Sequence, residues 1–309
     1  PGWGEDGGDM EKKRKAYNEA REDNYYSSRD GPLGYGLPVT GTWDDHDYAS
    51  DNEGRHYSCR RESQNEFVNH FNVPEDDPRH PSWGDDQQEG VYSSHMFAKP
   101  DGDKNGIHVI NLDTRYHRDP TFKYWGKCEG AKSDMLGKKQ WKWLEKELER
   151  VSEVLIIVSG IQVLPPTNLK HVEKDKFCAQ EKGKDEFEDA ITKVGESAQW
   201  RGGGDRVLEN WGEIPQARAR LLRLVQKYAN AGSYKVAIFL SGNMHWGEIM
   251  AKKMPADPDG AGPEQTLYEV SASGIDRFRD YEHPNSNRVR LRSVDTRGDK
   301  FYHNECKFP

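Results

Sequence analysis

The stretch Gly41-Thr42-Trp43-Asp44-Asp45-His46-Asp47-Tyr48 places three carboxylates and an imidazole in four consecutive positions. The apolar run Leu37-Pro38-Val39-Thr40 precedes it. Such a run predicts a strand that delivers the polar cluster to its C-terminal end, where α/β folds place their chemistry. Carboxylate oxygens and imidazole nitrogens are also the ligands that hard and borderline divalent metals select. This stretch therefore indicates an α/β fold with a polar site.

The plainest alternative is a solvated acidic turn, which is the usual explanation of an acidic run. Two features favour a site instead. The acidic run lies between two aromatic residues, and a second polar segment, Ser241-Gly242-Asn243-Met244-His245, follows another predicted strand much later in the chain.

Composition supports a globular protein. The chain has 309 residues, of which 33% are hydrophobic and 32% are charged, and we expect one domain over residues 1–309. Aromatic residues make up 11% and include nine Trp, which argues against disorder. The net charge of −8 disfavours nucleic acid as a partner. No apolar run reaches about 18 residues, so no membrane span is expected.

Hydrophobic periodicity predicts alternating strands and helices. Strands are expected at residues 91–97, 107–113, 154–158, 236–240 and 267–270, with a last segment at 288–294. Helices are expected at residues 10–26, 62–71, 136–149 and 215–229. Residues 91–97 and 107–113 should form a hairpin. Strands that alternate with helices indicate an α/β sheet with its site at one edge.

Together these segments resemble the alkaline phosphatase D family, the PhoD-like metallophosphatases. The resemblance covers about residues 11 to 280 and rests on several motifs in the family's order. They are Gly-Thr-Trp-Asp-Asp-His-Asp-Tyr at 41–48, Ile-Asn-Leu-Asp-Thr-Arg-Tyr at 110–116, Leu-Gly to Trp-Leu-Glu at 136–145, Ser-Gly-Ile-Gln-Val at 159–163, Pro-Gln-Ala-Arg-Ala-Arg-Leu-Leu at 215–222, and Leu-Ser-Gly-Asn-Met-His-Trp-Gly-Glu at 240–248. The resemblance implies an α/β/β/α sandwich with mixed sheets.

The resemblance also implies a metal-dependent phosphoric ester hydrolase, of the alkaline phosphatase or phosphodiesterase type, which uses a metal-activated water. The implied cofactors are divalent or trivalent ions of calcium, iron, zinc or manganese, and the implied substrate is a phosphate ester. By resemblance, Asp45, Gln162, Asn243 and His245 are the expected metal ligands. His46 is the expected catalytic imidazole.

Arg115 is the expected phosphate clamp, because a guanidinium binds phosphate with two parallel hydrogen bonds. A structural ion pair between Arg115 and Asp113 or Asp119 is an equally open alternative. The neighbouring residues Tyr116, His117 and Arg118 are expected at the surface.

Two departures from the family pattern favour a second hypothesis. The family's early strand, which ends in Gly-Asp followed by Tyr and a further Asp, has no counterpart before residue 41, so the first strand or strands of the fold are expected to be absent from this chain. Asn243 also stands where the family has Asp. The alternative is therefore a pseudoenzyme, or a structural subunit of a larger assembly, that keeps the phosphatase fold with a degenerate metal site.

Residues 165–210 interrupt the pattern. This stretch is rich in Lys, Glu and Asp and contains Gly202-Gly203-Gly204, so we expect a polar insertion outside the sheet that acts as a lid or contacts a protein partner. The four cysteines are widely spaced, which leaves disulfides and free thiols equally open. The expected location is secreted or organelle-luminal.

Overall fold

The computed structural model describes residues 9–22, 39–50, 52–98, 106–120, 133–165, 209–243, 247–257, 262–272 and 290–293. The helical elements are α1 (Met10–Glu22), α3 (Asp45–Tyr48), α4 (Arg60–His70), η1 (Pro81–Asp86), α6 (Gly137–Leu148), η5 (Trp211–Glu213) and α8 (Pro215–Asn230). The strands are β1 (Ser93–Phe97), β2 (Ile107–Asn111), β3 (Val154–Ser159), β4 (Val236–Ser241), β5 (Gly247–Met254), β6 (Gln265–Ala272) and β7 (Arg290–Ser293).

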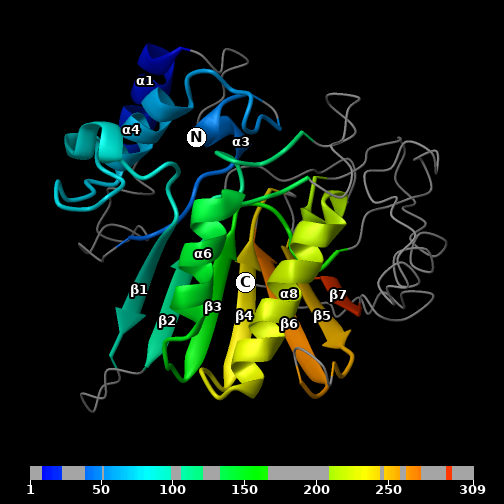
Figure 1. The fold of residues 1–309 in the computed structure, drawn as a ribbon. Helices are drawn as coiled ribbons and strands as arrows, with labels where there is room; N and C mark the ends of the chain where they lie inside the picture. Colours follow the sequence, from blue (N-terminus) through cyan, green and yellow to red (C-terminus); the bar gives the residue numbers. More distant parts are fainter. Residues whose placement is uncertain are drawn as a thin grey trace, which may run out of the picture.

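The strands form one mixed sheet of seven, in the order β1-β2-β3-β4-β6-β5-β7. Strands β2, β3, β4 and β6 are mutually parallel, while β1 pairs antiparallel with β2 and β5 pairs antiparallel with β6. The predicted hairpin pairing of β1 and β2 is confirmed, and so is the mixed α/β class. All four parallel strands end at the same edge, which lies at the top of Figure 1.

Helices α6 and α8 lie across one face of the sheet (Figure 1). Alternation along the strands explains this contact, because every second residue of β3 and β4 points toward the helices and is buried. Helix α8 begins with a proline, whose missing N–H costs nothing in the first turn. After α8 the chain turns at Gly232, whose φ of +86° lies in the left-handed region that glycine tolerates.

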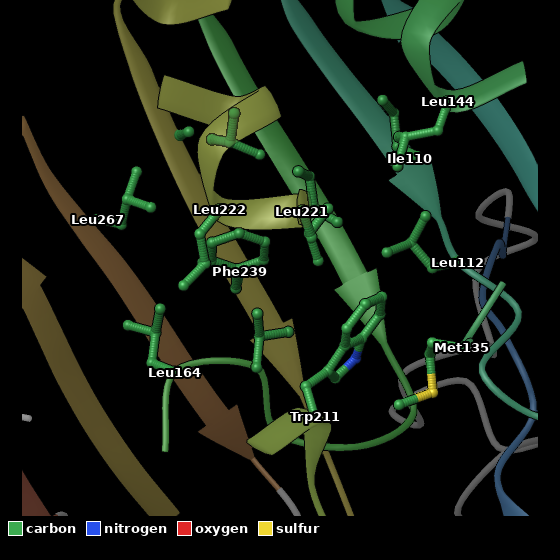
Figure 2. Close-up of a cluster of buried hydrophobic side chains, with 14 of the residues drawn as sticks. Ile110, Leu112, Met135, Leu144, Leu164, Trp211, Leu221, Leu222, Phe239 and Leu267 are labelled. Carbon is green, nitrogen blue, oxygen red and sulfur yellow. The ribbon is translucent and has the colours of Figure 1, made fainter. Parts of the chain in front are cut away.

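The main hydrophobic core fills the space between the sheet and these two helices. Figure 2 shows its centre, where Leu221 and Leu222 of α8 face Phe239 of β4 and Leu267 of β6, with Trp211 beside them. All five side chains are fully buried. Each such side chain contributes roughly 1.5–3 kcal/mol of transfer free energy, so this core carries most of the stability of the sheet.

A second, smaller core lies beyond the edge where the parallel strands end. It is an aromatic cluster made by Tyr17, Trp43, Tyr48, Ala49, Phe67, Val91 and Tyr116. These residues come from α1, α3, α4 and the loops beside them, and Figure 1 shows the three helices gathered above the sheet. The aromatic cluster therefore holds the segment 41–48 in place from the side opposite the sheet.

One expectation about local structure, the strand at residues 37–40, is wrong at the two of its residues that the structure describes. Val39 and Thr40 do not belong to a strand, and the acidic segment instead starts the short helix α3, with Asp44 at its N-cap. Carboxylates favour a helix N-terminus because they accept its unpaired backbone N–H groups and complement its dipole. The backbone N–H of Asp44 in turn donates to the carboxylate of Asp47 at 3.3 Å.

Strand β5 was not expected from the sequence. Its buried side chains are Met250, Lys252 and Met254, which alternate as in any strand. Lys252 stands where the alternation of a strand would have an apolar residue, so hydrophobic periodicity does not predict this strand.

Candidate active site

The candidate site lies where three parallel strands end. Strands β2, β3 and β4 finish at Asn111, Ser159 and Ser241, and polar residues follow each of them within a few positions. Segment 41–48 reaches this edge from the aromatic cluster. The site is thus assembled from stretches that are far apart in the sequence.

Asp113 joins segment 41–48 to the sheet. Its Oδ1 accepts hydrogen bonds from Trp43 Nε1 at 2.9 Å, from the backbone N–H of Arg115 at 2.8 Å and from that of Tyr116 at 2.9 Å. Its Oδ2 accepts the backbone N–H of Val91 at 2.8 Å. A buried carboxylate with this many donors is well compensated, so Asp113 acts as a structural anchor.

Gly160 allows the close approach of segment 41–48 to the end of β3. A Cβ at this position would lie 2.8 Å from the backbone oxygen of Trp43 and 3.3 Å from Asp44 Oδ1 and from Thr114 Oγ1. There is no room for a side chain here. The buried hydroxyl of Thr114 finds no hydrogen-bond partner among the described residues, so a polar group remains available at this contact.

Asp45 and His46 occupy the first turn of α3. Asp45 is buried, with Oδ1 accepting the backbone N–H of His46 at 2.9 Å and Oδ2 that of Asn52 at 3.2 Å. Burial alone would raise the pKa of Asp45, but the charges of Arg115 and His46 and these two hydrogen bonds outweigh it and lower the pKa. Asp45 is therefore held as a carboxylate, with His46 half-buried beside it.

Arg115 lies at the centre of an ion-pair network and has no exposed surface. Its Nη1 and Nη2 donate to Oε1 and Oε2 of Glu209 at 2.8 and 2.7 Å, and Nη2 also donates to Asp44 Oδ1. Nη1 of Arg118 lies 2.5 Å from Glu209 Oε1. The ion-pair alternative was thus correct in kind but not in its partners, and the phosphate clamp stays a prediction.

The carboxylates of this network outnumber its guanidiniums. Asp44, Asp45 and Glu209 face Arg115 and Arg118, which leaves one surplus negative charge when all are ionised. Burial, together with the charges of Asp45 and Glu209, raises the pKa of Asp44 to about 7 against the opposing effect of Arg115. Asp44 keeps 26% of its side chain exposed and is the solvent-facing acid of the network.

Two of the remaining predicted ligands lie nearby. Gln162 is buried in the loop after β3, where it forms an isolated parallel bridge with Asn210. Asn243 has a left-handed backbone with a φ of 70°, and its Nδ2 donates to Glu209 Oε2 at 3.3 Å. The structure thus brings Asp45, Arg115 and Asn243 together around Asp44 and Glu209. His245 lies outside the described residues.

The described residues do not by themselves supply a metal site. Within the described ranges, no three side chains of His, Cys, Asp or Glu are grouped so that they could hold a metal ion. Both carboxylate oxygens of Asp45 already accept backbone N–H groups. The guanidinium of Arg115 lies against the carboxylates of Asp44 and Glu209, in the positions that a metal ion would otherwise take. The metal-ligand set therefore stays a prediction.

Sequence reasoning missed Glu209 and Arg118 as members of this network. Tyr116 and Arg118 were expected at the surface, and both are buried. The signal lies in the spacing of Arg115 and Arg118 directly after a buried strand. Two arginines so close to the core require acidic partners, although the sequence does not say which acids provide them.

These features define an α/β protein whose polar residues converge at the carboxyl edge of a mixed sheet. The chain belongs to the PhoD-like phosphatase family, whose sequence profile matches residues 9–305. The solved structure of PhoD is similar to this chain with 14% sequence identity and a TM-score of 0.48. That similarity covers 76% of this chain but only 39% of the PhoD chain. No curated protein matches this sequence.

Three further expectations concern membrane spans, the cysteines and the insertion at residues 165–210. In the part of the chain that the structure describes, none of the helices combines the length and the apolar character needed to span a bilayer. Cys59 is a free thiol, whereas Cys128, Cys178 and Cys306 lie outside the described residues. Nearly all of the predicted insertion at 165–210 lies outside them as well. Its last two residues, Glu209 and Asn210, are buried at the site.

Proposed function

We propose that this chain carries the catalytic residues of a phosphoric ester hydrolase of the phosphatase or phosphodiesterase type. The observation that supports this proposal is the convergence at one edge of the sheet. Segment 41–48, with Asp45 and His46, lies against the end of β3, while Arg115 and Asn243 join it from the ends of β2 and β4. Because the chain belongs to a phosphatase family, we infer that these residues act on a phosphoric ester.

In this proposal His46 transfers a proton to the leaving oxygen of the ester. It stands in the first turn of α3, next to a carboxylate that stays ionised. Arg115 binds the phosphoryl oxygens. The N–H of Nη2 that now donates to the solvent-facing carboxylate of Asp44 donates to the substrate instead, while Nη1 and Nη2 keep their hydrogen bonds to Glu209. A phosphate oxygen matches the geometry that Asp44 Oδ1 now satisfies.

We propose further that hydrolysis depends on a bound metal ion. We propose Asp45, Gln162, Asn243 and His245 as ligands of a divalent or trivalent ion, with calcium, iron, zinc and manganese as the candidates. Carboxylate, amide and imidazole groups suit these ions as donors. A bound ion of this kind supplies positive charge to the phosphoryl group and lowers the pKa of a bound water.

The ion-pair network favours a second candidate function. Arg115 and Arg118 already compensate most of the acidic charge of the site, as expected when a protein keeps a fold but no longer binds cations there. The chain would then be a pseudoenzyme or a structural subunit of a larger assembly. A secreted or organelle-luminal location, and a protein partner that contacts residues 165–210, are proposals that fit either function.

A hydrolysis assay separates the two functions. The purified chain is incubated with an activated aryl phosphate monoester and with the corresponding diester, with each of the four candidate metals in turn. The enzyme proposal expects turnover, which His46→Ala reduces by roughly 10²-fold, the usual scale for a proton-transfer group. His56→Ala is the matched control, because His56 is an exposed histidine that lies ten positions after His46 in the sequence. Absence of hydrolysis under every condition supports the assembly role.

A further inference from the structure

Glu209 binds side chains from two separate stretches of the chain. Its Oε1 accepts from Arg115 Nη1 at 2.8 Å and lies 2.5 Å from Arg118 Nη1, and its Oε2 accepts from Arg115 Nη2 at 2.7 Å and from Asn243 Nδ2 at 3.3 Å. Only 5% of Glu209 is exposed. Both oxygens of this buried carboxylate thus contact the segment after β2, and Oε2 also contacts Asn243 in the segment after β4.

The backbone around Glu209 is itself fixed to the end of β3. The next residue, Asn210, forms the bridge with Gln162, and Trp211 donates its backbone N–H to the oxygen of Gln162 at 2.9 Å. Trp211 Nε1 also donates to Ser159 Oγ at 3.0 Å. The backbone next to Glu209 is therefore fixed, and the Glu209 carboxylate can orient the side chains that bind it.

The orientation of Arg115 follows from this arrangement. Two parallel hydrogen bonds to Glu209 fix both the position and the plane of the guanidinium. With that plane fixed, Nη2 reaches Asp44 on segment 41–48. Loss of the Glu209 charge would remove both parallel hydrogen bonds of Arg115 and the acid beside Arg118. A buried charge that loses its direct partner moves toward water.

We propose that Glu209 is a positioning residue of the site, which orients Arg115 so that one edge of the guanidinium faces the place where a phosphoryl group binds. This inference rests on the proposed function for the identity of the ligand. The orientation of Arg115 by Glu209 does not depend on it. The two claims are therefore tested by separate measurements on the same variants.

The first measurement is the reactivity of Arg115 toward phenylglyoxal, followed by mass spectrometry of the modified peptides. Arg115 has no exposed surface, so in the wild type it is protected, while Arg14 has 60% of its side chain exposed and serves as the internal reference. In Glu209→Gln the modification rate of Arg115 relative to Arg14 should rise at least about 10-fold, because removing a partner from a buried charge releases it. Glu147→Gln is the matched control, since Glu147 is also an ion-paired acid but faces Arg150 and His108.

The second measurement is steady-state hydrolysis of the activated aryl phosphate by the same variants. A clamp that binds phosphate equally in the ground and transition states affects KM, so Glu209→Gln should raise KM about 10-fold with little change in kcat. A purely structural defect would instead reduce the folded fraction, which lowers the apparent kcat and leaves KM unchanged. Glu209→Asp keeps the charge and should recover part of the lost affinity.

Each outcome has a defined meaning. If the relative reactivity of Arg115 in Glu209→Gln and in Glu209→Ala equals that of the wild type, the positioning role is overturned, whether or not the protein hydrolyses esters. If Arg115 becomes reactive but the wild type hydrolyses nothing, the proposed function fails and the positioning of Arg115 stands. If hydrolysis is present and KM is unchanged in Glu209→Gln, the role in phosphate binding is overturned. Circular dichroism establishes that each variant is folded at the assay temperature.

Discussion

Replacing Gly160 with alanine tests the packing of segment 41–48 against the sheet. The new Cβ would lie 2.8 Å from the backbone oxygen of Trp43, whereas ordinary contacts of this kind begin near 3.4 Å. Segment 41–48 must therefore move by about 0.6 Å, and it cannot do so by a side-chain rotation because the obstructing atom belongs to the backbone. The movement displaces the turn that carries Asp45 and His46.

The expected cost of Gly160→Ala follows from two opposing terms. Overpacking of a well-ordered contact destabilises by about 1–3 kcal/mol. The lower entropy of the unfolded chain with alanine offsets about 0.4–1 kcal/mol of this. A net loss of about 1–2 kcal/mol corresponds to a fall in Tm of roughly 1.5–3 °C for a domain of this size. Hydrolysis should fall further, by about 10- to 100-fold, because catalysis is sensitive to sub-ångström displacement of reacting groups.

Gly41→Ala is the matched control for this experiment. Gly41 belongs to the same segment, but a Cβ there would meet no atom within 4 Å and its backbone is not left-handed. This variant should keep wild-type activity and a Tm equal to or slightly above that of the wild type. Thermal denaturation and aryl phosphate hydrolysis are measured for both variants. A Gly160→Ala protein with wild-type Tm and activity would show that segment 41–48 does not pack as described.

Three further predictions address charge, metal binding and the insertion. Burial lowers the pKa of Lys13 from 10.5 to about 8. Between pH 8 and 10.5 the unfolded chain holds this proton and the folded chain does not, so the free energy of unfolding should rise by about 3 kcal/mol as the pH rises across this range. Urea titrations should show this rise in the wild type and not in Lys13→Met. Elemental analysis of the purified chain should find a stoichiometric metal that Asp45→Ala and His245→Ala each reduce, and an unchanged metal content in both variants contradicts the ligand assignment. Replacement of residues 181–203 by a short Gly/Ser linker should leave Tm unchanged while it alters substrate range or partner binding, and a large fall in Tm would mean that this segment is part of the core.

The main core was predictable because its signals are local. The β-branched run of β3, the apolar stripe of α6 that includes Leu144 and Leu148, and the proline at the start of α8 each identify an element without knowledge of the rest of the chain. The parallel order of β2, β3 and β4 also follows from the helices between them. These elements were correct to within a few residues.

The site was predictable only in its residue types. Arg115 and Asn243 both contact Glu209, and Asp44, next to Asp45, contacts Arg115, while the roles predicted for these residues stay predictions. The partners of Arg115 were not predictable, because Glu209 is 94 residues away from it in the sequence and follows a stretch with no periodic pattern. The strand predicted at residues 37–40, which the structure describes only at Val39 and Thr40, is wrong at those two residues for a different reason. An extended apolar run favours a strand, but the carboxylates after it stabilise a helix start.

The aromatic cluster has a consequence for how the protein responds to heat. Trp43 and Tyr48 belong to this small cluster and not to the large core between the sheet and helices α6 and α8. Small clusters open with a lower free energy than the main core, so the two can open at different temperatures. On gradual warming, amides of α3 and α4 should exchange with deuterium before those of β3 and β4 do. Activity would then be lost at a temperature where the strand signal in circular dichroism is still intact, and cooling from that point would restore it without refolding of the sheet.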